Sequence, residues 1–183
     1  HGVFRRQRQM CIRDSVMTRD EVFKATGPTV SSSMDVKIGM TKDGIITAGE
    51  AHLRYQGGAF PNGTVEMGAQ SAFAAYDLKA VRTKGWNVLT NRPKQAAYRA
   101  PGAPQAIYAV ESVVDELCQK LNLDPLEIRI KNAAKKGTKS SYGPTFDDIG
   151  LIATLEAAKK HPHYLAPLAC LLYTSDAADE RLR

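Results

Sequence analysis

The residues with the clearest chemical potential lie in the stretch Ala97–Gln105, whose sequence is AYRAPGAPQ. Pro101 and Pro104 fix φ and lack an N–H group, whereas Gly102 tolerates positive φ. The stretch is therefore predicted to form a stiff, bent loop that holds the Arg99 guanidinium beside small side chains. Such a loop lets a polar ligand approach the backbone while the planar cation binds its oxygens. A tight connection with a surface arginine is the alternative interpretation.

Together with the segments Asp115–Leu117 and Asp124–Asn132, this loop resembles the large subunit of the xanthine dehydrogenase/aldehyde oxidase family of molybdenum hydroxylases. In that family a loop of the form Ala-Phe/Tyr-Arg-Gly-Phe-Gly-Gly-Pro-Gln leads into a helix, and a Glu-Leu-Arg-x-Lys-Asn helix follows. The resemblance extends upstream through Thr18–Glu21 and Thr26–Thr29, and downstream to about residue 164. Agreement in order and spacing over most of the chain is more specific than a single motif.

The resemblance implies an oxidoreductase that hydroxylates a carbon next to nitrogen or oxygen, in an N-heterocycle or an aldehyde, with water as the oxygen source. It implies a molybdenum cofactor (molybdopterin, in the cytosine dinucleotide form), and iron–sulfur clusters and FAD on partner domains or subunits. A small-molecule substrate and a hetero-oligomer are therefore expected. Because the dithiolene sulfurs of the pterin hold the metal, no protein side chain is needed as a ligand.

Carried over position by position, Arg99 matches the family's arginine beside the molybdenum centre, where it would contact the cofactor rather than ligate the metal. Ala100 and Gly102 are expected to bind the cofactor with it. Many members have glycine at the position of Ala100, and carbon monoxide dehydrogenases have cysteine, so the missing thiol argues against that copper-dependent activity. Pro101 and Thr29 are expected in the substrate pocket. Purine hydroxylases carry a stacking phenylalanine and an orienting arginine there, which puts a purine substrate in doubt.

The resemblance places the family's catalytic glutamate far downstream, and other cofactor-lining segments upstream, of the region that this sequence covers. No catalytic residue is therefore expected here, and the chain alone is expected to be inactive. Glu111, Asp115 and Glu116 are not expected to take the place of that glutamate, and Asp115 and Glu116 are expected in helix contacts or in water. His161 and His163 form a His-x-His pair after a helix end, which favours a solvated turn over a metal site. The alternative function is a non-catalytic scaffold or anion-binding domain that shares part of the fold.

The order of the expected elements indicates an α+β fold that is a piece of a larger cofactor-binding domain, with no βαβ alternation. Alternating apolar residues over 36–55, with a turn at Lys42–Gly44, predict a β-hairpin that ends in a glycine-rich loop at 56–63. Residues 78–89 predict a further strand, and 65–76 are ambiguous, with a short helix as one interpretation. Three helices are then expected, at 103–121, from Asp124-Pro125 to Gly137, and from Asp148 or Gly150 to about Lys160.

The two ends of the chain differ from its middle. Residues 1–15 and 170–183 lack periodicity and resemble translated sequencing-adapter sequence, so they are expected to be non-native or disordered tails. Residues 16–169 are then expected to be an internal fragment of a molybdopterin-binding domain. The 183 residues include 25 Lys and Arg and 19 Asp and Glu, a net charge of +6. These basic residues form no block interleaved with aromatics, so nucleic-acid binding is not expected.

Cysteine usage and hydropathy bear on the cellular location of the protein and on its contact with membranes. The three cysteines, Cys11, Cys118 and Cys170, form no Cys-x-x-Cys pair. This pattern argues against a disulfide framework and against an iron–sulfur or zinc site, and a cytoplasmic location is the simplest expectation. Cys118 lies on an apolar helical face, where a thiol packs as a small hydrophobe. No apolar run is long enough to span a bilayer, so no membrane contact is expected.

Overall fold

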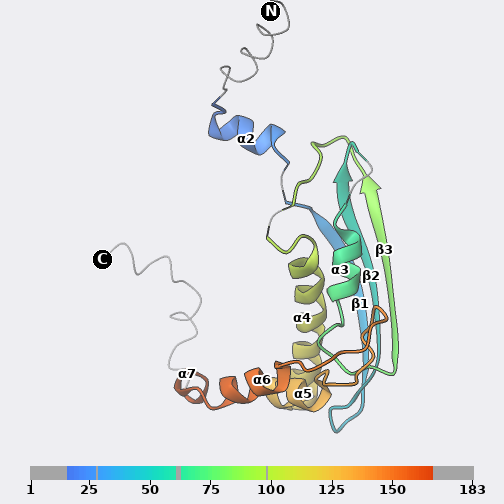
Figure 1. The fold of residues 1–183 in the computed structure, drawn as a ribbon, viewed down its shortest axis with the longest axis vertical. Helices are drawn as coiled ribbons and strands as arrows, with labels where there is room; N and C mark the ends of the chain where they lie inside the picture. The colour runs from blue at the N-terminus through green and yellow to red at the C-terminus, as the bar shows by residue number, and fades with distance from the viewer. Residues whose placement is uncertain (1–15, 28, 61–62, 98, 167–183) are drawn as a thin grey trace, which may run out of the picture.

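The computed structural model describes residues 16–27, 29–60, 63–97 and 99–166 (Figure 1). Its elements are, in chain order, α2 Arg19–Ala25, β1 Ser32–Met40, β2 Ile46–Gly58, α3 Val65–Ser71, β3 Ala80–Leu89, α4 Ala103–Leu121, α5 Pro125–Asn132, α6 Leu151–Lys159 and α7 Pro162–Leu165. The strands form one sheet in the order β1-β2-β3, and α3 and α4 cover one face of it. The predicted α+β class is confirmed. The predicted tails, at 1–15 and 170–183, lie outside the described residues.

β1 and β2 form the predicted antiparallel hairpin. The Gly44 N–H donates to the Thr41 carbonyl oxygen across the turn (3.0 Å), and Gly44 has a φ of +84°, the left-handed conformation that Asp-Gly turns favour. A Cβ on Gly44 would lie 2.2 Å from Ile128 Cδ1 of α5. The turn therefore favours glycine for its φ, and a side chain at this position would also have to displace the end of Ile128. β2 continues to Gly58, so the glycine-rich loop begins three residues later than expected.

β2 and β3 are parallel, and α3 lies between them in the chain. The expectation that the chain contains no βαβ alternation is therefore wrong. The unit escapes a periodicity analysis because α3 has only seven residues, and because parallel pairing joins residues that are about thirty positions apart, such as Glu50 with Arg82. The α+β class holds because the β1–β2 pair is antiparallel and the remaining helices follow the sheet.

The helices agree with the predicted positions except at two ends. α4 spans Ala103–Leu121 as expected. α5 ends at Asn132 and not at Gly137, because Ala133 turns to an extended conformation and pairs with Tyr76 in an isolated bridge. α6 ends at Lys159 as expected, but Pro162 then starts the short helix α7.

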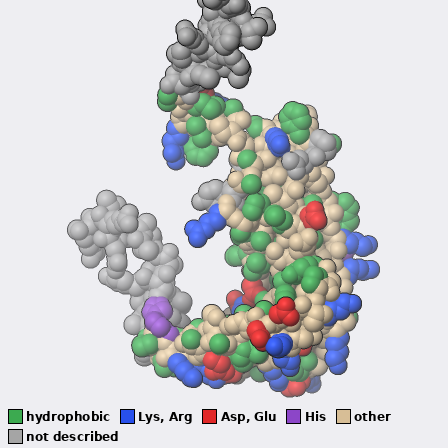
Figure 2. Space-filling view, in the orientation of Figure 1, with side chains coloured by type: hydrophobic (Ala, Val, Ile, Leu, Met, Phe, Trp, Pro, Cys, Tyr) green, Lys and Arg blue, Asp and Glu red, His purple; other side chains and the backbone are tan. Residues whose placement is uncertain are grey.

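The core lies between the sheet and helices α3 and α4. Its largest fully buried side chains are Tyr55, Phe73, Leu53, Val110, Val114 and Cys118. Burial of Cys118 in α4 confirms that this thiol packs as a hydrophobe. Lys and Arg side chains gather instead along the β3 edge of the molecule (Figure 2). Within the described part of the chain, no helix has the length and apolarity needed to cross a membrane.

Candidate functional site

The arginine loop, defined here as residues 94–102, is anchored firmly at its end. The hydroxyl of the fully buried Tyr55 in β2 donates a hydrogen bond to the Gly102 carbonyl oxygen (2.6 Å). Burial raises the pKa of Tyr55 to about 12, so it remains a neutral donor at physiological pH. A Cβ on Gly102 would lie 2.2 Å from the Thr64 carbonyl oxygen. Glycine therefore allows the loop to touch the backbone before α3.

The bend of the loop uses two left-handed positions, one on each side of Pro101. Ala100 has a φ of +54° and Gly102 a φ of +79°. The Ala103 N–H donates to the Ala100 carbonyl oxygen (3.2 Å), which closes the bend onto the first turn of α4. Left-handed backbone costs an alanine roughly 1 kcal/mol or more that glycine does not pay. This strain explains why many members of the family that the sequence resembles have glycine at the position of Ala100.

The start of the loop rests on two other glycines. A Cβ on Gly58, at the end of β2, would lie 2.8 Å from the Lys94 Cα atom. A Cβ on Gly27 would lie 2.6 Å from Ala96 Cβ, so the segment after α2 lies directly against the loop. Both glycines have positive φ. The loop is therefore in close contact with other backbone segments at both of its ends.

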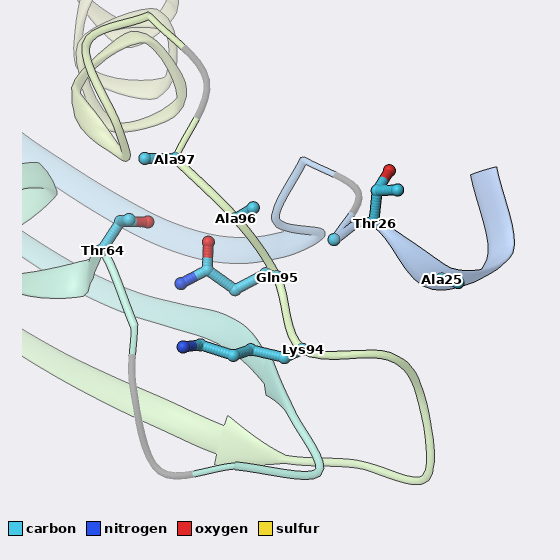
Figure 3. A pocket seen from close by; sticks show the side chains of 8 residues that line it. Ala25, Thr26, Thr64, Lys94, Gln95, Ala96 and Ala97 are labelled. Carbon is cyan, nitrogen blue, oxygen red and sulfur yellow. The ribbon is translucent and has the colours of Figure 1, made fainter. Parts of the chain in front are cut away.

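A hollow of about 450 Å³ lies beside the start of the loop (Figure 3). Its lining residues come from three separate segments: Ala25, Thr26, Gly27, Thr64, Lys94, Gln95, Ala96 and Ala97. Lys94 and Gln95 extend from the loop toward the side on which Thr64 lies (Figure 3). The Thr64 Oγ1 atom is buried and has no hydrogen-bond partner among the described residues.

The structure brings the predicted segments together but does not place the predicted side chains in the hollow. Arg99 is exposed and makes no ion pair or hydrogen bond with the described residues. Arg99, Pro101 and Thr29 do not line the hollow, although their neighbours Ala97 and Gly27 do. Pro28 and Tyr98, also in the predicted motifs, lie outside the described residues.

Sequence reasoning missed Lys94 and Thr64. Lys94 could have been found as the charged residue that begins the arginine loop. No sequence pattern indicates Thr64, because only the tertiary structure brings the end of the β2–α3 connection against residue 102.

Comparison with known proteins decides the family. Residues 14–133 match the family model described as the molybdopterin cofactor-binding domain. The chain belongs to this family. The large molybdopterin subunit of nicotinate dehydrogenase from Eubacterium barkeri is 31% identical over 149 residues, which are 79% of this chain and 35% of that protein. The xanthine dehydrogenase molybdenum-binding subunit of Escherichia coli is 29% identical over 148 residues, which are 79% and 20% of the two chains.

A solved structure agrees with this assignment. The aldehyde oxidoreductase from Desulfovibrio gigas superposes with a TM-score of 0.71 at 32% identity, over 76% of this chain and 15% of that protein. The predicted family resemblance is thereby confirmed. This chain spans about a third or less of the length of each of these relatives.

The polar atoms around the arginine loop fit a molybdopterin group. Two of them have no partner among the described residues: the Arg99 guanidinium and the buried Gln105 Oε1 in the first turn of α4. A buried polar atom without a partner costs about 1–3 kcal/mol, which a ligand rich in donors and acceptors would offset. Arg99, Gln105 and the backbone at Gly102 are the groups that would hold the pterin and the oxygens of its metal.

Two acidic residues of α4, Glu111 and Asp115, are used in helix contacts, as was expected for Asp115. Arg129 of α5 makes ion pairs with Glu111 (2.7 Å) and Asp115 (2.8 Å), and the Tyr76 hydroxyl donates to Glu111 (2.7 Å). Burial opposes the charge of Arg129, but the two carboxylates raise its pKa. Burial and the nearby Glu111 carboxylate raise the pKa of Tyr76. Glu116 is exposed. This network joins α4 to α5.

The histidine pair lies in a solvated turn, as expected. The His161 side chain caps α7 by accepting a hydrogen bond from the His163 N–H (3.2 Å), and both residues are exposed. Among the residues that the structure describes, no group of three or more His, Cys, Asp or Glu side chains could hold a metal ion.

Proposed function

We propose that this chain is an internal fragment of the catalytic subunit of a molybdenum hydroxylase, and that its arginine loop helps to enclose the molybdenum cofactor. One observation carries the proposal. The molybdopterin-binding family match includes the strained, tightly anchored bend on which an exposed Arg99 has no protein partner. An arginine held this way is ready to bind a ligand without breaking an existing interaction.

Each residue of the loop has a separate task in this proposal. The bound cofactor supplies two-electron oxidation of a substrate carbon. Arg99 binds cofactor oxygens with its forked donors and stabilises negative charge that develops beside them. The Tyr55 hydrogen bond to Gly102 keeps the bend in one conformation, so that Arg99 does not have to be ordered during the reaction. The small side chain of Ala100 leaves room for the cofactor.

The proposed substrate is an N-heterocycle or an aldehyde, with water as the source of the added oxygen. The names of two relatives, nicotinate dehydrogenase and aldehyde oxidoreductase, cover these two classes. Ala100 has no thiol, which disfavours copper-dependent oxidation of carbon monoxide. Pro101 and Thr29 can neither stack on a purine nor pair with it as phenylalanine and arginine would. A smaller or differently shaped substrate suits these residues.

The electrons are proposed to leave through iron–sulfur clusters and FAD on partner subunits or domains, in a cytoplasmic hetero-oligomer that uses the cytosine dinucleotide form of the cofactor. Two observations support electron carriers outside this chain. Cys118, the free cysteine of the described residues, is buried in the core. The chain also covers only 35% of the nicotinate dehydrogenase subunit and 20% of the xanthine dehydrogenase subunit, which leaves ample sequence for further domains.

The test is Arg99→Ala in the enzyme that contains this sequence. We expect turnover to fall by about 100-fold or more, because a charged donor aimed at the reacting centre is removed. Arg99→Lys should recover only part of the rate, because a lysine keeps the charge but loses the fork. Arg92→Ala, an exposed arginine of the preceding segment, is the matched control and should leave turnover unchanged. Molybdenum content per subunit is measured in parallel, and unchanged turnover in Arg99→Ala would exclude the role.

A non-catalytic anion-binding domain is the second candidate, favoured by the position of Lys94, and not Arg99, in the hollow. A longer reading frame separates the two functions. A Gly-Glu-x-Pro type glutamate downstream and a cofactor loop upstream would support the enzyme. A complete gene without either would support the anion-binding domain.

A further inference from the structure

The hollow beside the arginine loop is lined by a solvent-exposed cation that has no counter-charge among the described residues. Lys94 is the charged residue among the eight that line it, and the others are neutral. Lys94 forms no ion pair with any described residue. Its side chain extends from the loop toward the side on which Thr64 lies (Figure 3).

A second, independent observation points to a ligand at the same place. The Thr64 Oγ1 atom is buried and has no hydrogen-bond partner among the described residues. A threonine hydroxyl is both a donor and an acceptor, and its burial without a partner is unfavourable. A lysine ammonium and a hydroxyl on the same side of a hollow match the oxygens of a small anion.

The remaining walls define the size of the ligand. Ala25, Gly27, Ala96 and Ala97 have small side chains or none, and the contact of Gly27 with Ala96 makes this wall largely backbone. The volume of about 450 Å³ lies in the range of roughly 300–1,000 Å³ that small-molecule sites occupy. The space therefore suits one small ring or chain with an anionic group at its Lys94 end.

We propose that this hollow is an anion subsite in which Lys94 and Thr64 bind the carboxylate of the substrate. The inference rests on the proposed function, whose substrate class it narrows to carboxylate-bearing N-heterocycles or aldehydes. Lys94 provides the charge, and the Thr64 hydroxyl donates a hydrogen bond to a carboxylate oxygen. A phosphate group has similar oxyanion chemistry, so the experiment compares the binding of a carboxylate with the binding of inorganic phosphate.

The experiment follows binding to the ¹⁵N-labelled 183-residue chain by NMR. Nicotinate, its uncharged isostere nicotinamide, and inorganic phosphate are titrated separately. We expect nicotinate to shift the backbone amides of residue 64 and residues 94–97. Nicotinamide should bind about tenfold more weakly, because it lacks the charge that strengthens the hydrogen bonds.

Two variants and a control assign the effect to the named residues. Lys94→Gln should weaken nicotinate about tenfold and remove the preference over nicotinamide. Thr64→Val keeps the shape of the side chain and should weaken nicotinate severalfold. Lys135→Gln removes an exposed lysine after α5 and should change nothing. The dispersion of the spectrum reports whether each variant is folded, and Lys94→Gln alone is sufficient if Thr64→Val is not.

Several results would overturn the subsite. They are equal binding of nicotinate and nicotinamide, unchanged binding in Lys94→Gln, and no shift at residues 64 and 94–97. Tighter binding of phosphate at the same amides would assign the hollow to a phosphate group and remove the substrate carboxylate from it. The chain in this experiment carries no molybdenum. Its outcome is therefore independent of Arg99→Ala turnover, and the two proposals fail separately.

Discussion

The arginine loop and the end of α5 carry the two motifs of the family resemblance, and they treat their polar groups in opposite ways. At the end of α5, the Asn132 side chain accepts a hydrogen bond from the Ile46 N–H and donates to the carbonyl oxygens of Gly44 and Ile128, all at 2.8 Å. At the loop, Arg99 has no partner among the described residues and Ala100 is in a strained conformation. The first motif stabilises the fold, whereas the second is available for a ligand.

Removal of Asn132 is expected to have the largest effect on folding. In Asn132→Ala the buried Ile46 N–H and Gly44 carbonyl lose their partners, and the free energy of unfolding should fall by about 3 kcal/mol. Urea denaturation followed by circular dichroism measures this change. Arg99→Ala is the comparison and should change stability by less than about 0.5 kcal/mol, as at an ordinary exposed site. A similar loss in both variants would remove the distinction between the two motifs.

Gly102→Ala tests the anchor of the loop. The added Cβ would meet the Thr64 carbonyl oxygen at 2.2 Å on a backbone with φ of +79°. The loop must move, so we expect a loss of about 2 kcal/mol together with altered NMR shifts at residues 64 and 94–103. Gly137→Ala has a similar positive φ but open space around it. Comparing the two variants therefore separates the stability lost to backbone strain from the stability lost to the collision with Thr64.

Glu111→Gln tests the network between α4 and α5. The amide can still accept from the Tyr76 hydroxyl, but it loses the charge that pairs with the half-buried Arg129. Asp115 retains one ion pair with Arg129, so the unfolding free energy should fall by only about 1 kcal/mol. Thermal denaturation measures it. A double-mutant cycle with Arg129→Met should show coupling, and additive effects would contradict the network.

Ala100→Gly is expected to have the smallest effect, and the opposite sign. Glycine relieves the left-handed strain but adds freedom to the unfolded chain, so the net gain in stability should be about 0.5 kcal/mol. Differential scanning calorimetry of the variant and the unchanged protein under identical conditions measures this gain in stability. A clear loss of stability would show that the bend depends on the Ala100 methyl group and not on the backbone alone.

Local patterns explain most of what could be predicted from the sequence. The hairpin and α4 follow from strict apolar periods and from the Asp-Gly turn, which need no information from distant residues. The stiff bend at Pro101 and Gly102 follows from the intrinsic backbone limits of those residues. α2 was missed although its signal was present: Thr18 and Glu21 form a capping box, in which the Glu21 N–H donates to Thr18 Oγ1 (3.3 Å) and the Thr18 N–H to Glu21 Oε2 (2.7 Å).

The parts that could not be predicted depend on distant segments. The parallel partner of β2, the end of α5 at its bridge to Tyr76, and the approach of Thr64 to Lys94 all depend on tertiary packing. A sequence pattern indicates which residues share a face of one element. It does not indicate which two loops meet. For this reason Arg99 could be singled out from its local sequence, whereas the Lys94 and Thr64 pair could not.

The parallel pairing of β2 with β3 has a consequence for how this domain can change. Both strands end at the same edge of the sheet, so the connections that leave them carry Thr64 and Lys94 to one place. The rim at that edge is made of short connections, while the register of the sheet depends on strand residues well behind it. A few substitutions in these connections can therefore change which ligand the domain prefers without disturbing the sheet that carries them.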